Sequence, residues 1–327
     1  MDGTWYTPPV TAGPDPSSPF RLGPSTSMAR TTSTSSRVPT GLPKLDEMLA
    51  GGLVPGTVAV VYGATGIGKT HLGLTFAEHG GFADGARGLV FDMNGRGDPQ
   101  QHDEYAARLF RWTLKPWSHT VTPMADPYPP PGAMESYYSN AFPWVGRTRD
   151  FQVETPGGLE FDWNWKATYN HALYTVRPFF YFHFGAGSRR VVVDGVEPMD
   201  SRADSIQFFL FDELYRKVIH REAETLGMEI CLPVWKHRAF IDSHLYNHRQ
   251  ITTMLLVTSE ETRLEDLIAR KVSMGDVGAT ANTILVMGSE RAGNRLARML
   301  AVVKHRGSAM SDAIVEFRIG ANGIEFA

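Results

Sequence analysis

The chain has 327 residues, of which 42% are hydrophobic, so it is long enough for one large α/β domain or two small ones. Its formal net charge of −3 argues against a protein that coats nucleic acid by electrostatic attraction. Cys231 is the single cysteine, which excludes an internal disulfide framework and a thiolate metal site. No apolar run approaches the roughly 18 residues of a membrane span, and no secretory signal is recognisable, so we expect a cytoplasmic protein.

Residues 1–37 are rich in proline, serine, threonine and glycine and show neither a helical nor a strand period. Such a segment cannot bury enough apolar surface to offset the entropy lost on ordering, so we expect a disordered tail. We assign residues 38–327 to one α/β domain with an insertion at about 115–150. The insertion is rich in proline and aromatic residues, and loops of such length in compact domains are usually functional or disordered. We expect it to form an ordered lid or a surface for a protein partner.

Apolar strands alternate with amphipathic helices along the domain, which predicts a mostly parallel sheet covered by helices on both faces. The predicted strands lie near 57–62, 88–93, 189–194, 252–258 and 283–287, with an edge strand over 159–165. The predicted helices lie near 42–49, 71–79, 102–114, 169–184 and 205–226, the fourth of them interrupted at Pro178. The segments 295–304 and 314–319 also have strand composition, and turn signals follow each of them, so we expect antiparallel strands at the C-terminus.

A phosphate-binding loop is predicted between the first strand and the helix after it, because residues 63–70 match the pattern G-x-x-x-x-G-K-[ST] in full. The residues of the loop are Gly63, Ala64, Thr65, Gly66, Ile67, Gly68, Lys69 and Thr70. Its glycines allow the backbone N–H groups to turn toward a polyphosphate, and the helix adds the positive end of its dipole. Lys69 is then expected to contact the β- and γ-phosphates of ATP, and the Thr70 hydroxyl to bind Mg²⁺. A chance glycine-rich turn is the alternative, which the strand before and the helix after disfavour.

A second motif, an apolar strand that ends in an acidic residue, supports the same chemistry. The apolar strand Val191-Val192-Val193 ends at Asp194, which is the form of a Walker B strand. Apolar strands that end in aspartate are common, but beside a phosphate loop the pattern is fairly specific. An acidic residue at a neighbouring strand end is needed to hold the water shell of Mg²⁺. We therefore assign Asp194 to the metal site.

Five features in this order resemble the KaiC-type branch of the RecA superfamily of ATPases. They are residues 38–46, the Gly51-Gly52 turn, the phosphate loop, the strand 191–194 and the late segment 303–308. The resemblance extends from about residue 37 to the C-terminus, apart from the insertion. It implies a RecA-like core, with ATP bound between neighbouring subunits of a homo-oligomeric ring, most often a hexamer. It also implies that Lys304 and Arg306 point at the γ-phosphate held by the next subunit, where an arginine finger contributes about 10³ to 10⁵ in rate.

The chain departs from this family pattern at the position of the catalytic base. Asn94 follows the strand 88–93, where the glutamate that orients the attacking water is expected. An amide can position water but cannot accept its proton, and a general base contributes about 10² to 10⁴ in rate. We therefore expect slow hydrolysis, unless Asp92 or Glu197 acts as the base. KaiC also carries two tandem copies of the domain and this chain has room for one, so its clock-specific phosphorylation chemistry is not carried over.

Two other sets of residues are weaker candidates for a site. His244 and His248 are four residues apart, but they lack the acidic partner of an H-E-x-x-H motif and a third ligand, so we interpret them as ordinary histidines rather than zinc ligands. Residues 259–271 include Arg263, Arg270 and Lys271 in a region that faces DNA in RecA-type recombinases. Glutamates and an aspartate share this segment, and the mixed charge is more typical of a solvated helical face than of a phosphate track.

Three functional hypotheses follow from the sequence. The first is an ATPase that drives or times a conformational change in a ring, which the intact nucleotide motifs favour. The second is an ATP-dependent switch or partner platform with little turnover, which Asn94 favours. The third is a DNA recombination or repair factor, which superfamily membership favours and the charge disfavours. The fold alone does not decide among them.

Overall fold

The computed structural model describes residues 37–93, 101–116, 137–139, 152–155, 158–161, 176–196, 206–231, 238–270 and 277–327. These residues fall within one compact unit, Ser35–Ala327. The predicted tail lies outside the described residues except for Arg37, so its disorder stays a prediction.

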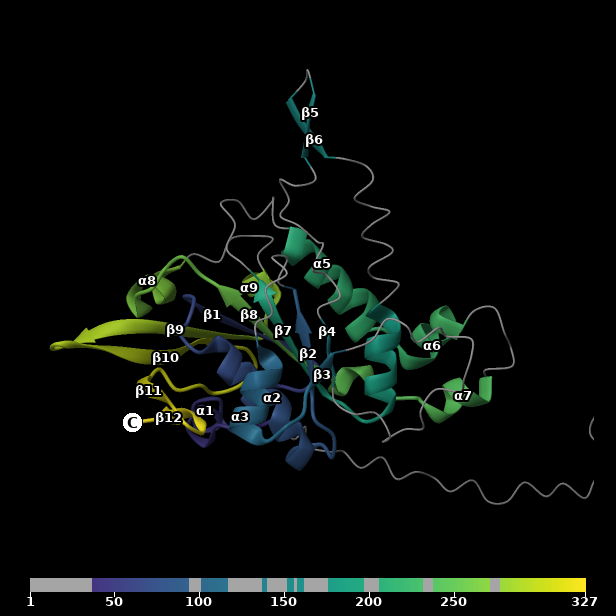
Figure 1. Ribbon diagram of the computed structural model, residues 1–327, viewed down its shortest axis with the longest axis horizontal. Helices are drawn as coiled ribbons and strands as arrows, with labels where there is room; N and C mark the ends of the chain where they lie inside the picture. Colours follow the sequence, from purple (N-terminus) through teal and green to yellow (C-terminus); the bar gives the residue numbers. More distant parts are fainter. Residues whose placement is uncertain are drawn as a thin grey trace, which may run out of the picture. The chain divides into compact units, whose positions relative to one another are not determined.

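A mixed sheet forms the centre of the domain (Figure 1). Over the described residues its strand order is β12-β11-β10-β9-β1-β8-β7-β2-β4-β3. The parallel strands are β1 Val58–Gly63, β2 Leu89–Asp92, β3 Lys115–Pro116, β4 Tyr137–Ser139, β7 Arg190–Val196, β8 Thr252–Thr258 and β9 Thr283–Ala292. The antiparallel strands are β10 Arg295–His305, β11 Ile314–Gly320 and β12 Gly323–Phe326. The predicted class, a mostly parallel α/β sheet with antiparallel strands at the C-terminus, is confirmed.

The central strands are apolar without a break because helices cover both faces of the sheet. Val60 and Tyr62 of β1 belong to one layer of the core, whereas Ala59 and Val61 belong to the other. Successive side chains of a strand point to opposite faces, so one short strand contributes to both layers.

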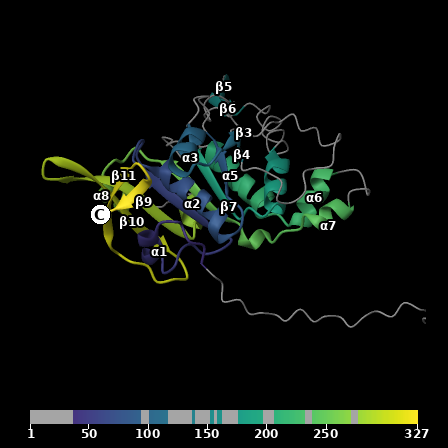
Figure 2. The same ribbon diagram turned by 60° about the horizontal axis from the view of Figure 1, so that its bottom comes forward.

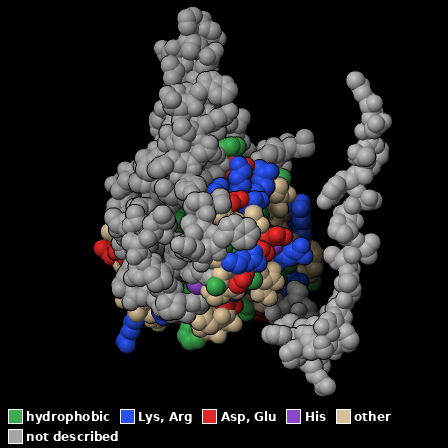
Figure 3. Space-filling model, turned by 90° about the vertical axis from the view of Figure 1, so that its right-hand side faces the viewer, with side chains coloured by type: hydrophobic (Ala, Val, Ile, Leu, Met, Phe, Trp, Pro, Cys, Tyr) green, Lys and Arg blue, Asp and Glu red, His purple; other side chains and the backbone are tan. Residues whose placement is uncertain are grey.

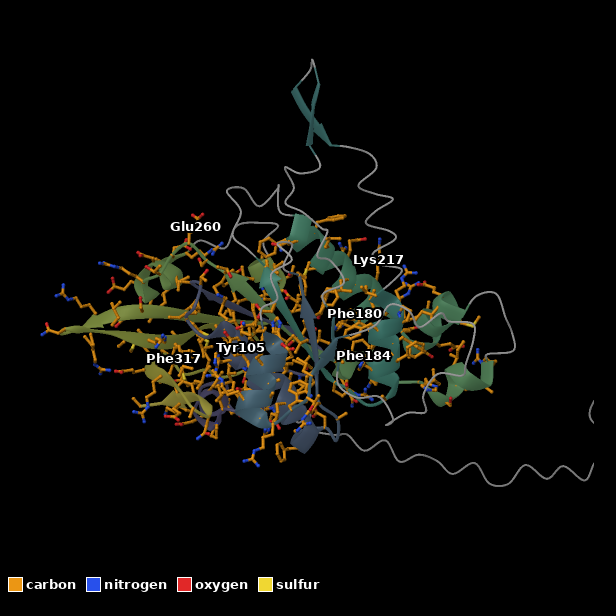
Figure 4. All side chains as sticks on the ribbon, viewed as in Figure 1. Tyr105, Phe180, Phe184, Lys217, Glu260 and Phe317 are labelled. Atoms are coloured by element: carbon orange, nitrogen blue, oxygen red, sulfur yellow. The ribbon has the colours of Figure 1, made fainter. Side chains whose placement is uncertain are left out.

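One face of the sheet is covered by α1 Pro43–Met48, α2 Lys69–Ala83 and α3 His102–Phe110, which Figure 2 shows in front of the strands. The main helices over the other face are the helix 176–185, α5 Ile206–Leu214, α6 Ala223–Cys231 and α8 Leu264–Ala269. Phe180 and Phe184 belong to the helix 176–185 (Figure 4), and their rings lie 5.7 Å apart between centroids. Phe180 also lies 5.4 Å from Phe91 of β2, so this helix is held to the sheet by aromatic contacts.

Three predicted elements differ from the structure. The single helix predicted over 205–226 is instead α5, a π-helical turn η3 Tyr215–Ile219 and a separate α6. The N–H of His220 bonds the carbonyl of Tyr215 over 2.8 Å, five residues back, and the regular helix ends there. Pro178 lies within continuous helix over 176–185, so the helix is not interrupted at this residue. The segment assigned to the insertion carries the short strands β3 and β4, and β4 extends the sheet beside β2.

The remaining described elements are short. They are the hairpin of β5 Gln152–Thr155 and β6 Gly158–Phe161, and the helical segments α7 Arg238–Ser243, η5 His248–Gln250 and α9 Val277–Thr280. The edge strand predicted over 159–165 corresponds to β6 in its first residues, and 162–165 lie outside the described part of the chain.

A buried arginine ties the segment 38–46 to the core, and the sequence did not reveal it. Arg190 of β7 is fully buried and donates to the carbonyl of Pro39 over 2.5 Å and to the carboxylate of Asp84 over 2.6 Å. Its guanidinium also lies 4.9 Å from the ring centre of Phe76 on α2. One cation therefore connects the N-terminal segment, α2 and β7.

Candidate functional site

The predicted phosphate loop joins the carboxyl end of β1 to the first residue of α2. Gly66 and Gly68 have φ angles of +77° and +120°, which other residues rarely adopt. A Cβ at Gly66 would meet nothing within 4 Å, whereas a Cβ at Gly68 would lie 2.9 Å from Ile319 of β11. A Cβ at Gly63 would lie 2.6 Å from the carbonyl oxygen of Met287 on β9. The loop therefore packs tightly against the sheet at both ends and is open at Gly66.

Lys69 lies across the inside of this loop. Its ammonium group donates to the carbonyls of Gly63 and Ala64 over 2.9 and 3.0 Å, and the residue is only 7% exposed. Burial lowers the pKa of Lys69 to about 8, although the charge of Asp194 acts in the opposite direction. A partly desolvated cation beside an open glycine loop is a fitting site for a polyphosphate.

Thr70 and Asp194 meet at the other side of the loop. The Thr70 hydroxyl donates to Oδ2 of Asp194 over 2.7 Å, and Oδ1 accepts the N–H of Gly195 over 2.8 Å. Burial alone would raise the pKa of Asp194, but hydrogen bonds from His102, Thr70 and Gly195 and the charge of His102 lower it overall. A hydroxyl and an ionised carboxylate in contact are hard oxygen ligands of the kind that Mg²⁺ prefers.

His102 is a residue of this site that sequence reasoning missed. It begins α3, and its Nε2 lies 3.2 Å from Oδ2 of Asp194 while its Nδ1 lies 3.8 Å from Oδ2 of Asp92. Asp92 and Asp194 are register partners on β2 and β7. Burial opposes protonation of His102, but Asp194 first, then Asp92 and Asp103, raise its pKa overall. The available signal was the position of a histidine in the first turn of a helix that follows a strand ending in aspartate.

Gln207 of α5 is a second residue that the sequence did not single out. Its amide nitrogen donates to the carbonyls of Met93 and Gly195 over 2.9 and 3.0 Å, which joins the ends of β2 and β7. Asn94 follows Met93, and Glu197 follows β7 directly, but both lie outside the described residues, so their proposed roles stay predictions. The alternative base Asp92 is described, and it is buried against His102.

Lys304 and Arg306 are not brought to the phosphate loop of their own chain. Lys304 donates to the carbonyls of Gly278 and Ala279 over 2.8 and 3.1 Å, and Arg306 donates to Ala279 over 3.1 Å. These carbonyls belong to α9, which precedes β9 and lies at the amino edge of the parallel strands. The phosphate loop leaves the carboxyl edge, and a strand as long as β1 spans roughly 16 Å between the two edges.

The weaker candidates do not form sites within the described residues. No group of three histidine, cysteine, aspartate or glutamate side chains there is arranged to hold a metal, and His244 instead lies 2.9 Å from the hydroxyl of its neighbour Ser243. Arg270 stacks 4.7 Å from the ring centre of Tyr62 and bonds Ser259, so it faces its own chain. Lys271 lies outside the described residues, whereas Arg263 is exposed.

The surface over α5 to α7 also carries mixed charge. Figure 3 shows basic and acidic side chains interspersed on the described part of this face. The ion pairs include Arg238 with Glu224 at 2.6 Å and Arg221 with Glu229 at 2.7 Å. DNA binding would require a continuous basic track, and none is visible on this part of the face. None of the described helices has the length and hydropathy to cross a membrane.

The family model described as the KaiC ATPase matches residues 38–116, which include the 38–46 segment, the phosphate loop and α3. The matched part of the chain, residues 38–116, is therefore similar to the P-loop ATPase domain of KaiC. This similarity and the geometry of the loop both support nucleotide binding.

Among solved structures, the chain is similar to a KaiC-like protein from the hyperthermophilic archaeon Pyrococcus horikoshii OT3. The two share 18% sequence identity with a TM-score of 0.48, over 89% of this chain and 98% of the other. Among curated proteins, none matches significantly.

Proposed function

We propose that this KaiC-like protein hydrolyses ATP at the interfaces between subunits of a homo-oligomeric ring, most often a hexamer, and uses the cycle to drive a conformational change. One observation carries the proposal: the phosphate-loop side chains and the late cations lie at opposite edges of one sheet. Lys69, Thr70 and Asp194 meet at the carboxyl edge, whereas Lys304 and Arg306 bond α9 at the amino edge. Head-to-tail packing of subunits would let each chain complete the site of its neighbour.

The residues present fit ATP with Mg²⁺. The phosphates of ATP would replace the two loop carbonyls as the acceptors of Lys69, and the backbone N–H groups of the loop would surround them. Thr70 and Asp194 would hold Mg²⁺, Thr70 directly and Asp194 through its water shell. When bound, the metal supplies positive charge that stabilises the departing phosphoryl group.

The two late cations have a role in this scheme only across an interface. Charge builds on the phosphoryl oxygens during transfer, and a guanidinium in contact with them neutralises it. Arg306 is exposed and holds one carbonyl of α9, so leaving that contact costs about one hydrogen bond. Lys304 would support it from the same strand end.

The test is to measure ATP binding, turnover and assembly state together, for the wild type, Lys69→Ala and Arg306→Ala. Lys69→Ala should lose tight ATP binding, because the loop loses its only side-chain cation. Arg306→Ala should bind ATP nearly as the wild type but turn it over at least ~10-fold more slowly, a conservative share of a finger's contribution. Mixed Lys69→Ala and Arg306→Ala subunits should recover part of the activity at hybrid interfaces. No recovery after verified subunit exchange would contradict the action on a neighbour's nucleotide.

A second function, an ATP-dependent switch with little turnover, is favoured by Asn94 in place of the expected glutamate. In this version ATP orders the ring, and the insertion at 115–150 presents a surface to a protein partner. The strands β3 and β4 support such a surface, because they attach parts of the insertion to the edge of the sheet. Assembly that requires ATP, and that a non-hydrolysable analogue supports equally well, would favour the switch. The proposed location is the cytoplasm, which the single cysteine supports.

A further inference from the structure

His102 occupies a place that helix formation does not require. It is 2% exposed and lies at the start of α3, where histidine is neither a preferred cap nor a strong helix former. Its two ring nitrogens instead face the carboxylates of Asp194 and Asp92, at the ends of two hydrogen-bonded parallel strands. Placing an imidazole between two buried carboxylates costs desolvation, so the contact needs an account in terms of the site.

The carboxylate of Asp194 is held by three donors. Thr70 and His102 both approach Oδ2, at 2.7 and 3.2 Å, and the N–H of Gly195 approaches Oδ1 at 2.8 Å. An ionised carboxylate has about four acceptor positions, so three donors leave room for about one more. Rotation of the carboxylate would break all three contacts. Its orientation is therefore fixed before any metal binds.

Orientation of this group is what a magnesium site depends on. Mg²⁺ demands near-octahedral geometry and keeps several waters, so a carboxylate that holds its water shell must point in one direction. Groups that orient a ligand from behind typically contribute about 10-fold to 100-fold in metal affinity. The Thr70 hydroxyl itself is expected to turn its oxygen to the metal, which leaves His102 as the side chain whose bond to Asp194 serves orientation alone.

We propose that His102 is a positioning residue of the Mg²⁺–nucleotide site, which holds Asp194 in the orientation that the metal's water shell needs through the bond from Nε2 to Oδ2. Asp92 lies on the other side of the ring, with its Oδ2 3.8 Å from Nδ1, so its charge also favours this placement of the imidazole. This inference rests on the proposed function, because it concerns the same site. It adds α3 to the elements that determine metal affinity.

The experiment measures the affinity for a non-hydrolysable ATP analogue, once with excess EDTA and once with saturating Mg²⁺. No turnover then occurs. The ratio of the two dissociation constants is the gain from Mg²⁺. His102→Ala should reduce this gain about 10-fold or more, and leave the affinity in EDTA within about twofold, because the phosphate loop is untouched. His102→Gln should retain most of the gain, because its amide nitrogen can reach the place of Nε2. His248→Ala is the matched control, since η5 precedes β8 at the opposite edge of the sheet.

Each result supports or overturns the inference. A full gain in His102→Ala would overturn it, and so would an equal loss of affinity with and without Mg²⁺, which indicates general loss of packing. If His102→Ala does not fold, the comparison uses His102→Gln and His102→Asn. The amide nitrogen of Gln can reach the place of Nε2, and that of Asn the place of Nδ1. Equal gains from Mg²⁺ in these two variants would then overturn the inference. A wild type that binds the analogue but gains nothing from Mg²⁺ would contradict the metal site and this inference with it. A wild type that binds no analogue would contradict the proposed function as a whole.

Discussion

The hydroxyl of Thr70 donates to Oδ2 of Asp194 over 2.7 Å and so joins the first turn of α2 to β7. The two residues are 124 positions apart in sequence. They meet because α2, which follows β1, packs against β7 of the same sheet. Asp194 lies inside β7, where the register shifts between Val193 and Val196 and Gly195 has a φ of +83°. This irregularity bends the strand at the carboxylate and turns Gly195 N–H toward Oδ1.

The first prediction concerns the hydroxyl of Thr70. Thr70→Val keeps the shape of the side chain but removes the proposed metal ligand, so the gain in nucleotide affinity from Mg²⁺ should fall by at least ~10-fold. Thr70→Ser keeps the hydroxyl and should remain within about threefold of the wild type. Isothermal titration with and without Mg²⁺ measures both. Equal gains in Thr70→Val and Thr70→Ser would remove Thr70 from the metal site.

The second prediction concerns the pH dependence of Lys69. Its pKa is about 8 in the folded chain against an ordinary value of 10.5, so between these values the unfolded chain binds a proton that the folded chain does not. This group therefore makes the ligand-free protein more stable as the pH rises through that window. Bound phosphates need the protonated form, so nucleotide affinity should fall by up to about tenfold per pH unit above about 8.

Lys69→Arg is the matched control for this pH dependence, because a guanidinium stays charged throughout the range. Its affinity should start lower, because a guanidinium is larger than the ammonium group that the loop holds, but it should lack the decline above about pH 8. Dissociation constants measured across that range for both proteins decide the matter. A parallel decline in the two would assign the pH dependence to another group.

The sequence indicated the phosphate loop and Asp194, whose patterns are local, and missed the residues whose partners lie on other elements. Residues 63–70 are contiguous, so their pattern alone fixes the loop, and Asp194 was recognisable from its own strand. His102, Gln207 and Arg190 act through partners on other strands and helices. Their partners cannot be identified from the local sequence, because the order of the strands brings them together. The same reason explains β4, whose pairing with β2 a proline-rich segment does not suggest.

The third prediction concerns Arg190, whose removal leaves polar groups of the interior without their donor. Arg190→Met keeps much of the volume but leaves Asp84 and the carbonyls of Pro39 and Phe76 unpaired. The free energy of unfolding should fall by roughly 3 to 5 kcal/mol, as for other broken buried ion pairs. Arg189→Met is the neighbouring control, because Arg189 is half-buried and, within the described residues, donates to two carbonyls and to no carboxylate, and it should cost about 1 to 2 kcal/mol. Urea unfolding measures both, and equal losses would contradict the role of Arg190.

The fourth prediction concerns Asn94, which follows the last described residue of the β2 segment, Met93. The N–H of Met93, the residue before Asn94, bonds the carbonyl of Asp194, so Met93 lies at the same edge of the sheet as the proposed metal site. If the missing carboxylate limits the chemical step, Asn94→Glu should raise ATP turnover by at least ~10-fold, a conservative share of what a placed base contributes. Nucleotide affinity should barely change, because the loop and Lys69 are untouched.

A single-turnover measurement is the appropriate readout for Asn94→Glu, because it reports the chemical step before product release. Asn94→Gln is the matched control: it has the length of glutamate but keeps the amide, so it should not accelerate hydrolysis. Acceleration in both variants would indicate an effect of side-chain length rather than of a base. If the wild type already hydrolyses ATP at an ordinary rate and Asn94→Glu adds nothing, Asp92 or Glu197 becomes the candidate base. The switch with little turnover would then lose its main support, and hydrolysis by the ring would stand as the function.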